Sequence, residues 1–298
     1  MRPGANMRRL LVLKLLVCGA CAAPVASPQV SEQPPAAAER SVDWSAAVEA
    51  EARALEDGHP GAEVRIVVLD AAGIQVLAKH GDVETATATG STMKPLTVFA
   101  ALGAGLDPAT TIDASTPLEV DGETIQDASN NGVLTLSQAI AKSSNVAVAQ
   151  VVQRVGWEVV YPRVSQLVPL PDSTGMSELE AIAQLDGFVT AVPLRQLASA
   201  YATMAEAPEG AVMLEMLRLA VGPEGTGGRA AVPGLEVLGK TGTARHDGTQ
   251  DAVFVGRVSD GETSVWIAVS VHDVAEDAYG GAVAAPAFAR IAAAALSG

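Results

Sequence analysis

The spacing of apolar residues changes along this chain, and each change predicts a different element. From Asp43 to Gly58, the stretch DWSAAVEAEARALEDG repeats its apolar residues at helical intervals, which predicts a helix. EVRIVVLD and IQVLAKH flank Ala71-Ala72-Gly73, an arrangement that predicts a strand, a turn and a second strand. The long region from Ser91 to about Ala207 is mostly helical in its spacing.

The C-terminal part returns to strand-like runs. LEVLGKTGTA, AVFVGRV and TSVWIAVSV are separated by turns that contain Gly and Asp, and AAPAFARIAAAAL follows with Pro286 near its start, which predicts three strands and a terminal helix. The order therefore predicts an α+β fold, built as three α/β/α layers. A five-stranded antiparallel sheet is expected to be flanked by helices, with an all-helical subdomain inserted into it.

The first residues follow a third pattern. Arg8 and Arg9 precede an apolar run, and small residues follow up to Ala22, the order typical of a secretory signal peptide. We therefore expect a signal peptide at residues 1–22 and an exported protein of the periplasm or cell envelope.

Two further features lie after this leader and at its end. Residues 23–42 are rich in Pro, Ala and Ser, which predicts a flexible linker ahead of a domain at residues 43–298. Gly19-Ala20-Cys21 also resembles the end of a bacterial lipobox, so membrane attachment through a lipidated Cys21 is the alternative to cleavage after Ala22.

Composition excludes some function classes. The chain has 19 Lys plus Arg against 34 Asp plus Glu, a formal net charge of -15, and such a surface repels nucleic acid. Both cysteines lie in the leader, so the domain has no disulfide framework. The four histidines show no metal-ligand spacing and are expected at the surface. Asp121, Glu123 and Asp127 do not fit a calcium loop and are predicted to lie in a solvated loop. No metal or cofactor is expected.

One string raises the question of nucleotide binding. GLEVLGKT, from Gly234 to Thr241, matches the P-loop pattern at every fixed position. A P-loop needs a strand before its first Gly and a helix that begins at its Lys-Thr. Here AAVP precedes and TGTARHDGTQ follows, and neither fits, so another role for Lys240 is expected.

Three short strings appear in a specific order. The first holds Ser91 and Lys94 in GSTMK at a predicted helix start, and the second holds Ser143 and Asn145 between two helical stretches. The third, on a predicted strand, consists of Lys240, Thr241, Gly242 and Thr243. This order is the arrangement of the penicillin-recognising serine acyltransferases.

The residue types suit acyl transfer. Ser91 and Lys94 lie one helical turn apart, so a neutral Lys94 amine can take the proton of the Ser91 hydroxyl. Burial and a second cation, Lys240, would lower the pKa of Lys94 towards that state. The backbone N–H groups of Ser91 and Thr243 are expected to stabilise an oxyanion.

The remaining residues fit substrate binding and proton relay. Ser143 is expected to relay a proton to the leaving amine, and Asn145 to hold the peptide backbone of the substrate. Within the third string, the lysine and the two threonines offer a cation and hydroxyls to a terminal carboxylate, and Gly242 allows close approach.

The flanks of the three strings resemble class B penicillin-binding proteins, which are peptidoglycan transpeptidases. TGSTMKPLTVFAAL, SNNGVLTLSQAIAKSSNVAVAQVVQRVG, VPLRQLASAYATMA and EGTGGRAAVPGLEVLGKTGTA carry the resemblance, which covers roughly residues 62–295. It implies a β-lactamase/transpeptidase-like fold and a D,D-transpeptidase. That enzyme would form a Ser91 acyl-enzyme with D-Ala-D-Ala stem peptides and bind β-lactam antibiotics covalently.

Alternatives from other classes stay open. A D,D-carboxypeptidase would pass the acyl group to water. A serine β-lactamase would hydrolyse its acyl-enzyme fast, but no convincing Glu-x-x-x-Asn motif lies between Asn145 and Lys240. Class D β-lactamases carry an apolar residue where Asn145 stands. A non-catalytic β-lactam sensor or scaffold is the third class.

Overall fold

The structure is a computed structural model that describes residues 42–246 and 248–296. The predicted signal peptide, with Cys21, and the predicted linker up to residue 41 lie outside these residues. None of the helices in the described ranges has the length and hydropathy needed to cross a membrane.

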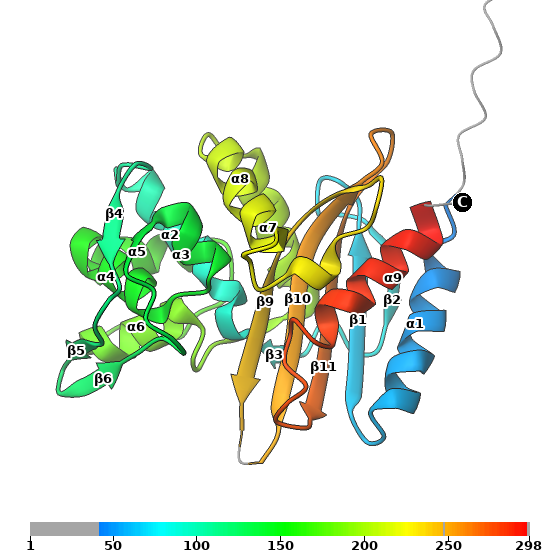
Figure 1. Cartoon of the computed structure of the whole chain (residues 1–298), viewed down its shortest axis with the longest axis horizontal. Coiled ribbons are helices and arrows are strands. Elements are labelled where there is room, and N and C mark those ends of the chain that lie inside the picture. Colours follow the sequence, from blue (N-terminus) through cyan, green and yellow to red (C-terminus); the bar gives the residue numbers. More distant parts are fainter. Residues whose placement is uncertain (1–41, 247, 297–298) are drawn as a thin grey trace, which may run out of the picture. The chain divides into compact units, whose positions relative to one another are not determined.

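A five-stranded antiparallel sheet forms the centre of the domain, in the order β2-β1-β11-β10-β9. Its strands are β1 (Glu63–Leu69), β2 (Val76–His80), β9 (Glu236–Arg245), β10 (Gln250–Ser259) and β11 (Ser264–Val274). All five coincide with runs that the sequence predicts as strands. The first and last parts of the chain thus share one sheet, and β9 forms its edge beside the helical region (Figure 1).

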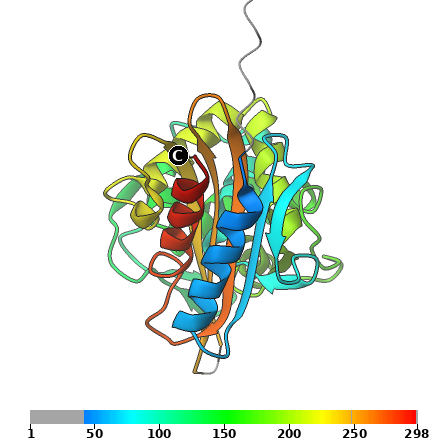
Figure 2. The ribbon, with the colours of Figure 1, turned by 90° about the vertical axis from the view of Figure 1, so that its right-hand side faces the viewer.

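Two hydrophobic cores lie on opposite faces of this sheet, because successive strand residues point to opposite sides. Val67 and Leu69 belong to the core shared with the inserted helices, whereas Ile66 and Val68 belong to the other core. Helices α1 (Trp44–Gly58) and α9 (Ala284–Leu296) pack side by side over that second face, as Figure 2 shows. On the first face, α7 (Leu194–Glu206) packs against β1, β10 and β11.

The chain between β2 and β9 supplies the inserted part. Its helices are α2 (Lys94–Gly103), α3 (Leu136–Ala141), α4 (Asn145–Val155), α5 (Trp157–Val164), α6 (Glu178–Asp186), α7 and α8 (Gly210–Val221). Three short ladders accompany them: β3 (Ala86–Ala88) with β8 (Ala191–Pro193), β4 (Thr111–Asp113) with β7 (Val133–Thr135), and β5 (Leu118–Val120) with β6 (Glu123–Ile125). The predicted fold class is confirmed, and the insert carries these ladders in addition to its helices.

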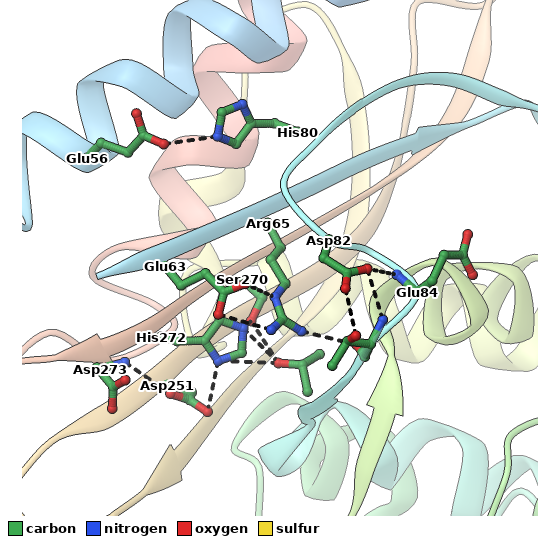
Figure 3. A network of polar contacts seen from close by, with 12 residues as sticks. Glu56, Glu63, Arg65, His80, Asp82, Glu84, Asp251, Ser270, His272 and Asp273 are labelled. Atoms are coloured by element: carbon green, nitrogen blue, oxygen red, sulfur yellow. Dashed lines mark hydrogen bonds and ion pairs between the residues drawn. The ribbon is translucent and has the colours of Figure 1, made fainter. Parts of the chain in front are cut away.

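A polar network joins the central sheet to β3, the strand that leads to Ser91 (Figure 3). The Nε2 atom of His272 lies 2.9 Å from Thr87 Oγ1 and 3.1 Å from Ser270 Oγ. Its Nδ1 atom lies 3.2 Å from Asp251 Oδ2. Only 9% of His272 is exposed, so the expectation of a surface position is wrong for this histidine. Its partners on three strands satisfy its polar atoms inside the fold.

We expect Asp251→Asn to lower the free energy of unfolding at neutral pH. Burial raises the pKa of Asp251, but hydrogen bonds from His272 and His246 outweigh burial and bring that pKa from 3.8 to about 2. Since His246 is partly exposed, solvent screening reduces the expected loss to about 1–2 kcal/mol. A depressed carboxyl pKa stabilises the fold above pH 3.8 and loses this effect as the pH falls towards 2.

Urea denaturation measures this effect. The difference between wild type and Asp251→Asn should shrink when the pH falls from 7 to 3. Asp57→Asn, on the exposed side of α1, is the matched control and should leave the unfolding curve nearly unchanged. Equal stability of wild type and Asp251→Asn at pH 7 would contradict the prediction.

Candidate active site

Ser91 lies in a 3₁₀ turn, Gly90–Met93, that runs directly into α2. Lys94, the first residue of α2, is fully buried and donates a hydrogen bond from Nζ to Ser91 Oγ at 2.8 Å. Tyr201 stabilises this turn, because its buried hydroxyl donates a hydrogen bond to the Thr92 carbonyl at 2.7 Å. The predicted contact between the serine and the lysine is therefore present in the structure.

The second string lies between α3 and α4. Asn145 accepts a hydrogen bond from Lys94 Nζ at 2.8 Å through Oδ1 and donates one from Nδ2 to the Gln126 carbonyl at 2.9 Å. Ser143 adopts a left-handed conformation with φ of 60°, a costly geometry for a residue other than glycine. Its hydroxyl accepts a hydrogen bond from Lys240 Nζ at 2.9 Å.

Asp127 holds this second string in place. Its carboxylate accepts hydrogen bonds from the Ser144 hydroxyl and the Asn145 N–H, both at 2.6 Å, and from the Val146 N–H at 3.1 Å. These groups belong to the first turn of α4, where a carboxylate satisfies free donors and complements the helix dipole. Asp127 lies in a loop, as predicted, but it is only half-exposed, because its carboxylate binds donors from a segment distant in sequence. Glu123 of the same stretch lies on β6 and not in a loop.

We expect Asp127→Ala to slow the reaction of Ser91 and to destabilise the fold. The substitution leaves the donors at the start of α4 without an acceptor, which costs about 1–3 kcal/mol, and it loosens Asn145, which contacts Lys94. Thermal unfolding and the rate of acylation by a β-lactam measure the two effects. Glu123→Ala removes an exposed carboxylate of the same region and is the control. Equal stability and equal acylation rates of the two variants would contradict the proposed role of Asp127.

The third string lies on β9, at the edge of the sheet. Lys240 is fully buried, and burial, aided by the charge of Lys94, brings its pKa well below the ordinary value against the opposing charge of Asp186. The Thr241 hydroxyl lies 2.6 Å from the Thr226 hydroxyl. Lys240 and Thr241 thus lie inside a strand that turns back into β10, a context that does not fit a P-loop.

Gly242 brings β9 against the segment before Ser91. A Cβ atom on Gly242 would lie 2.2 Å from the Thr89 carbonyl oxygen, and one on Gly90 would lie 2.5 Å from the Thr243 nitrogen. The two backbones are therefore in direct contact. This packing is a second reason for a glycine at position 242, in addition to the predicted approach of a substrate.

Two adjoining cavities open beside Ser91. One of about 580 Å³ is lined by Ser91, Asn145, Phe188 and Thr243, among others, and one of about 380 Å³ by Ser91, Ser143, Thr226, Thr241 and Thr243. Neither lysine lines these cavities, because both are fully buried. Lys94 contacts Ser91, and Lys240 contacts Ser143. All eight predicted site residues therefore lie together: six of them line the two cavities, and the two lysines lie buried beside them.

One charged residue of the candidate active site, Asp186, is not predicted from the sequence. Asp186, the last residue of α6, is fully buried and forms an ion pair with Lys94, with Oδ1 to Nζ at 3.2 Å. Burial raises its pKa to about 6, although the charge of Lys94 acts in the opposite direction. Lys94 therefore has a carboxylate beside it, in addition to the burial and the Lys240 charge that the sequence predicts. A lone Asp in a helical stretch gives no signal of such a contact.

The arrangement can support nucleophilic catalysis. A hydroxyl in contact with a buried amine is the pair that acyl transfer through serine requires. A second hydroxyl, on Ser143, links the cavity to the second buried amine, Lys240. Hydroxyls of Thr226, Thr241 and Thr243 gather at the same cavity, and such donors suit a carboxylate.

Comparison with known proteins identifies the family of this chain. The family model for the penicillin binding protein transpeptidase domain matches residues 64–184 and 211–293. The chain therefore belongs to the family of penicillin-binding protein transpeptidase domains.

Individual relatives are distant. The probable peptidoglycan D,D-transpeptidase PbpC of Pseudomonas aeruginosa is 27% identical over 70% of this chain and 45% of its own length. The peptidoglycan D,D-transpeptidase FtsI of Escherichia coli is 27% identical over 68% of this chain and 42% of its own length. The chain thus spans less than half the length of these curated relatives.

Solved structures share the fold. A peptidoglycan glycosyltransferase structure from Burkholderia ambifaria matches with a TM-score of 0.74 and 26% identity, over 84% of this chain and 93% of that chain. The apo TP domain of penicillin-binding protein 3 from Burkholderia pseudomallei matches with a TM-score of 0.75 and 24% identity, over 88% of this chain and 97% of that chain.

Proposed function

We propose that this protein is a peptidoglycan D,D-transpeptidase that forms an acyl-enzyme on Ser91 with stem peptides ending in D-Ala-D-Ala. The observation that carries the proposal is the 2.8 Å contact between Ser91 Oγ and the buried Nζ of Lys94 at the wall of an open cavity. β-Lactam antibiotics, which offer a strained amide to the same nucleophile, are the expected covalent ligands.

The geometry suggests a role for each group. Neutral Lys94 takes the proton of Ser91 while Oγ attacks the peptide carbonyl. Ser143, bonded to Lys240, passes a proton to the departing D-Ala amine, and an acceptor amine then resolves the acyl-enzyme. Thr241 and Thr243 bind the terminal carboxylate, and Asn145 holds the peptide backbone.

The cellular setting belongs to the same proposal. Residues 43–298 form the penicillin-binding domain, and residues 1–22 direct the chain to the periplasm or cell envelope. Lipidation of Cys21 would attach it to the membrane there. Peptidoglycan stem peptides are then its substrates.

One reaction mixture tests the function. The protein is incubated with a synthetic peptide ending in D-Ala-D-Ala and a D-amino acid as amine acceptor, and the products are identified by mass spectrometry. We expect a product in which the acceptor replaces the terminal D-Ala. Release of D-Ala to water alone would assign a D,D-carboxypeptidase, and rapid consumption of benzylpenicillin would assign a β-lactamase. No product and no penicillin adduct would leave the scaffold role.

A further inference from the structure

Asp186 occupies a position that is unfavourable for a carboxylate in three ways. Its side chain is fully buried, and within the described ranges neither of its oxygens has a hydrogen-bond partner. It is also the last residue of α6, where the helix dipole repels negative charge. Its one compensating contact among the described residues is the ion pair with Lys94 at 3.2 Å. A costly charged group beside a nucleophile points to a role in the chemistry.

The end of α6 is firmly held against the elements that carry Ser91 and Lys94. The hydroxyl of Thr97, on α2, donates to the Leu185 carbonyl at 2.6 Å. Gly187 ends the helix in a left-handed conformation with φ of 90°, and a Cβ atom there would lie 1.9 Å from the Gly90 carbonyl oxygen. Asp186 is therefore fixed beside Lys94 by the fold and does not depend on a mobile loop.

The surroundings of Lys94 are those of an ammonium group. Its Nζ lies 2.8 Å from Ser91 Oγ, 2.8 Å from Asn145 Oδ1 and 3.2 Å from Asp186 Oδ1. Among the described residues, the three hydrogen bonds of Nζ run to Ser91 Oγ, Asn145 Oδ1 and, at 3.4 Å, the backbone carbonyl of Asp186, and the Asp186 carboxylate lies beside it as the counter-ion. An ammonium has no lone pair, so in this state Lys94 cannot take the proton of Ser91.

We propose that Asp186 is the positioning residue that accepts the extra proton of Lys94 and so converts it into a base. An N–H bond of Lys94 breaks, an O–H bond of Asp186 forms, and the pair keeps its net charge. The free amine then takes the Ser91 proton as Oγ attacks, and that proton later passes through Ser143 to the leaving amine. Asp186 returns its own proton to Lys94, which restores the ion pair. This inference rests on the proposed function, because acylation of Ser91 is the step that it serves.

The charges around Asp186 set the pH range of this exchange. Burial raises its pKa to about 6, Lys94 and Lys240 act to lower it, and Asp127 acts to raise it. Above that pH the pair of Lys94 and Asp186 holds one exchangeable proton, which can lie on either group. Below it a second proton enters the pair, and Asp186 can no longer accept one. Acylation should therefore be independent of pH above about pH 6 and fall below it.

The experiment measures the rate of acylation by benzylpenicillin from pH 4.5 to 9 in wild type and in Asp186→Asn. The amide keeps the shape of the side chain but accepts no proton, so Lys94 must release its proton to solvent. We expect the acidic limb of the profile to move to higher pH by at least about one unit, which lowers the rate at pH 6 roughly tenfold. Asp186→Glu, which keeps a carboxylate, should move the limb back. Asp107→Asn, in an exposed loop, is the control for loss of one charge.

The outcomes separate a chemical role from a structural one. Two results overturn the inference. In the first, the acylation rate of Asp186→Asn falls at the same pH as that of wild type or at a lower pH. In the second, the rate is reduced by the same factor at every pH. If Asp186→Asn does not fold, the wild-type profile decides alone: a limb near pH 6 supports the inference, and a constant rate down to pH 4.5 overturns it. A wild-type protein that forms no adduct at any pH would instead remove the proposed function.

Discussion

Replacing Ser91 by alanine is expected to abolish the covalent adduct with benzylpenicillin. Wild type should gain the mass of one drug molecule, whereas Ser91→Ala should react at least ~10⁴-fold more slowly, because removal of a serine nucleophile leaves no group to form the ester. Intact-mass spectrometry followed over hours measures both the extent and the lifetime of the adduct. A long-lived adduct is expected of a transpeptidase, whereas a fleeting adduct with consumption of the drug indicates a β-lactamase.

The fold should tolerate this change, so loss of the adduct can be read as loss of the nucleophile. Ser91 is half-buried, and its hydroxyl contacts Lys94 at the wall of the cavity. Ser45→Ala, on the exposed side of α1, is the matched control and should react as wild type does. Labelling of Ser91→Ala at the wild-type rate would show that another residue is the nucleophile.

Gly187→Ala should inactivate the site without touching any of its reacting groups. The new Cβ atom would lie 1.9 Å from the Gly90 carbonyl oxygen and 3.2 Å from Met93 Cβ, so the turn that carries Ser91 must move. A displacement of about 1 Å in an active site costs on the order of a hundredfold in rate. The clash and the left-handed backbone together should lower the free energy of unfolding by roughly 3 kcal/mol.

Gly175→Ala separates these two causes. Gly175 also has a positive φ, 77°, but a Cβ atom there would meet nothing within 4 Å. This variant should lose about 1 kcal/mol through backbone strain alone and should keep the wild-type acylation rate. The measurements are chemical denaturation and acylation kinetics on both variants. Similar kinetics for the two variants would contradict the steric argument.

The sheet and the three strings could be predicted because their signals are local. Apolar runs such as EVRIVVLD and TSVWIAVSV report burial directly, and the spacing of Ser91 and Lys94 fixes their contact within one turn. The ladders β3–β8, β4–β7 and β5–β6 are not predicted, since strands of three residues are too short to show an alternating pattern.

The supporting residues of the site could not be predicted, because each acts across a large distance in sequence. Asp127 contacts residues at the start of α4 that lie 17 to 19 positions further along the chain, and Tyr201 contacts Thr92 at a separation of 109 positions. Asp186 contacts Lys94 only after α6 has packed against α2. A carboxylate or phenol in a helical stretch has the same local pattern whether it faces solvent or a buried partner.

The strand order of the sheet also has a consequence for how the protein acquires its reactivity. β1 pairs with β11, so Glu63 lies opposite His272, and β9 reaches its place only as the neighbour of β10. Pairing of segments so distant in sequence is slow to form and needs nearly the whole domain to be synthesised. Lys240 lies on β9 and enters its buried position only at that stage. The site in which Ser91, Ser143 and Lys240 meet is therefore completed only late in folding, when the last strands of the domain have paired.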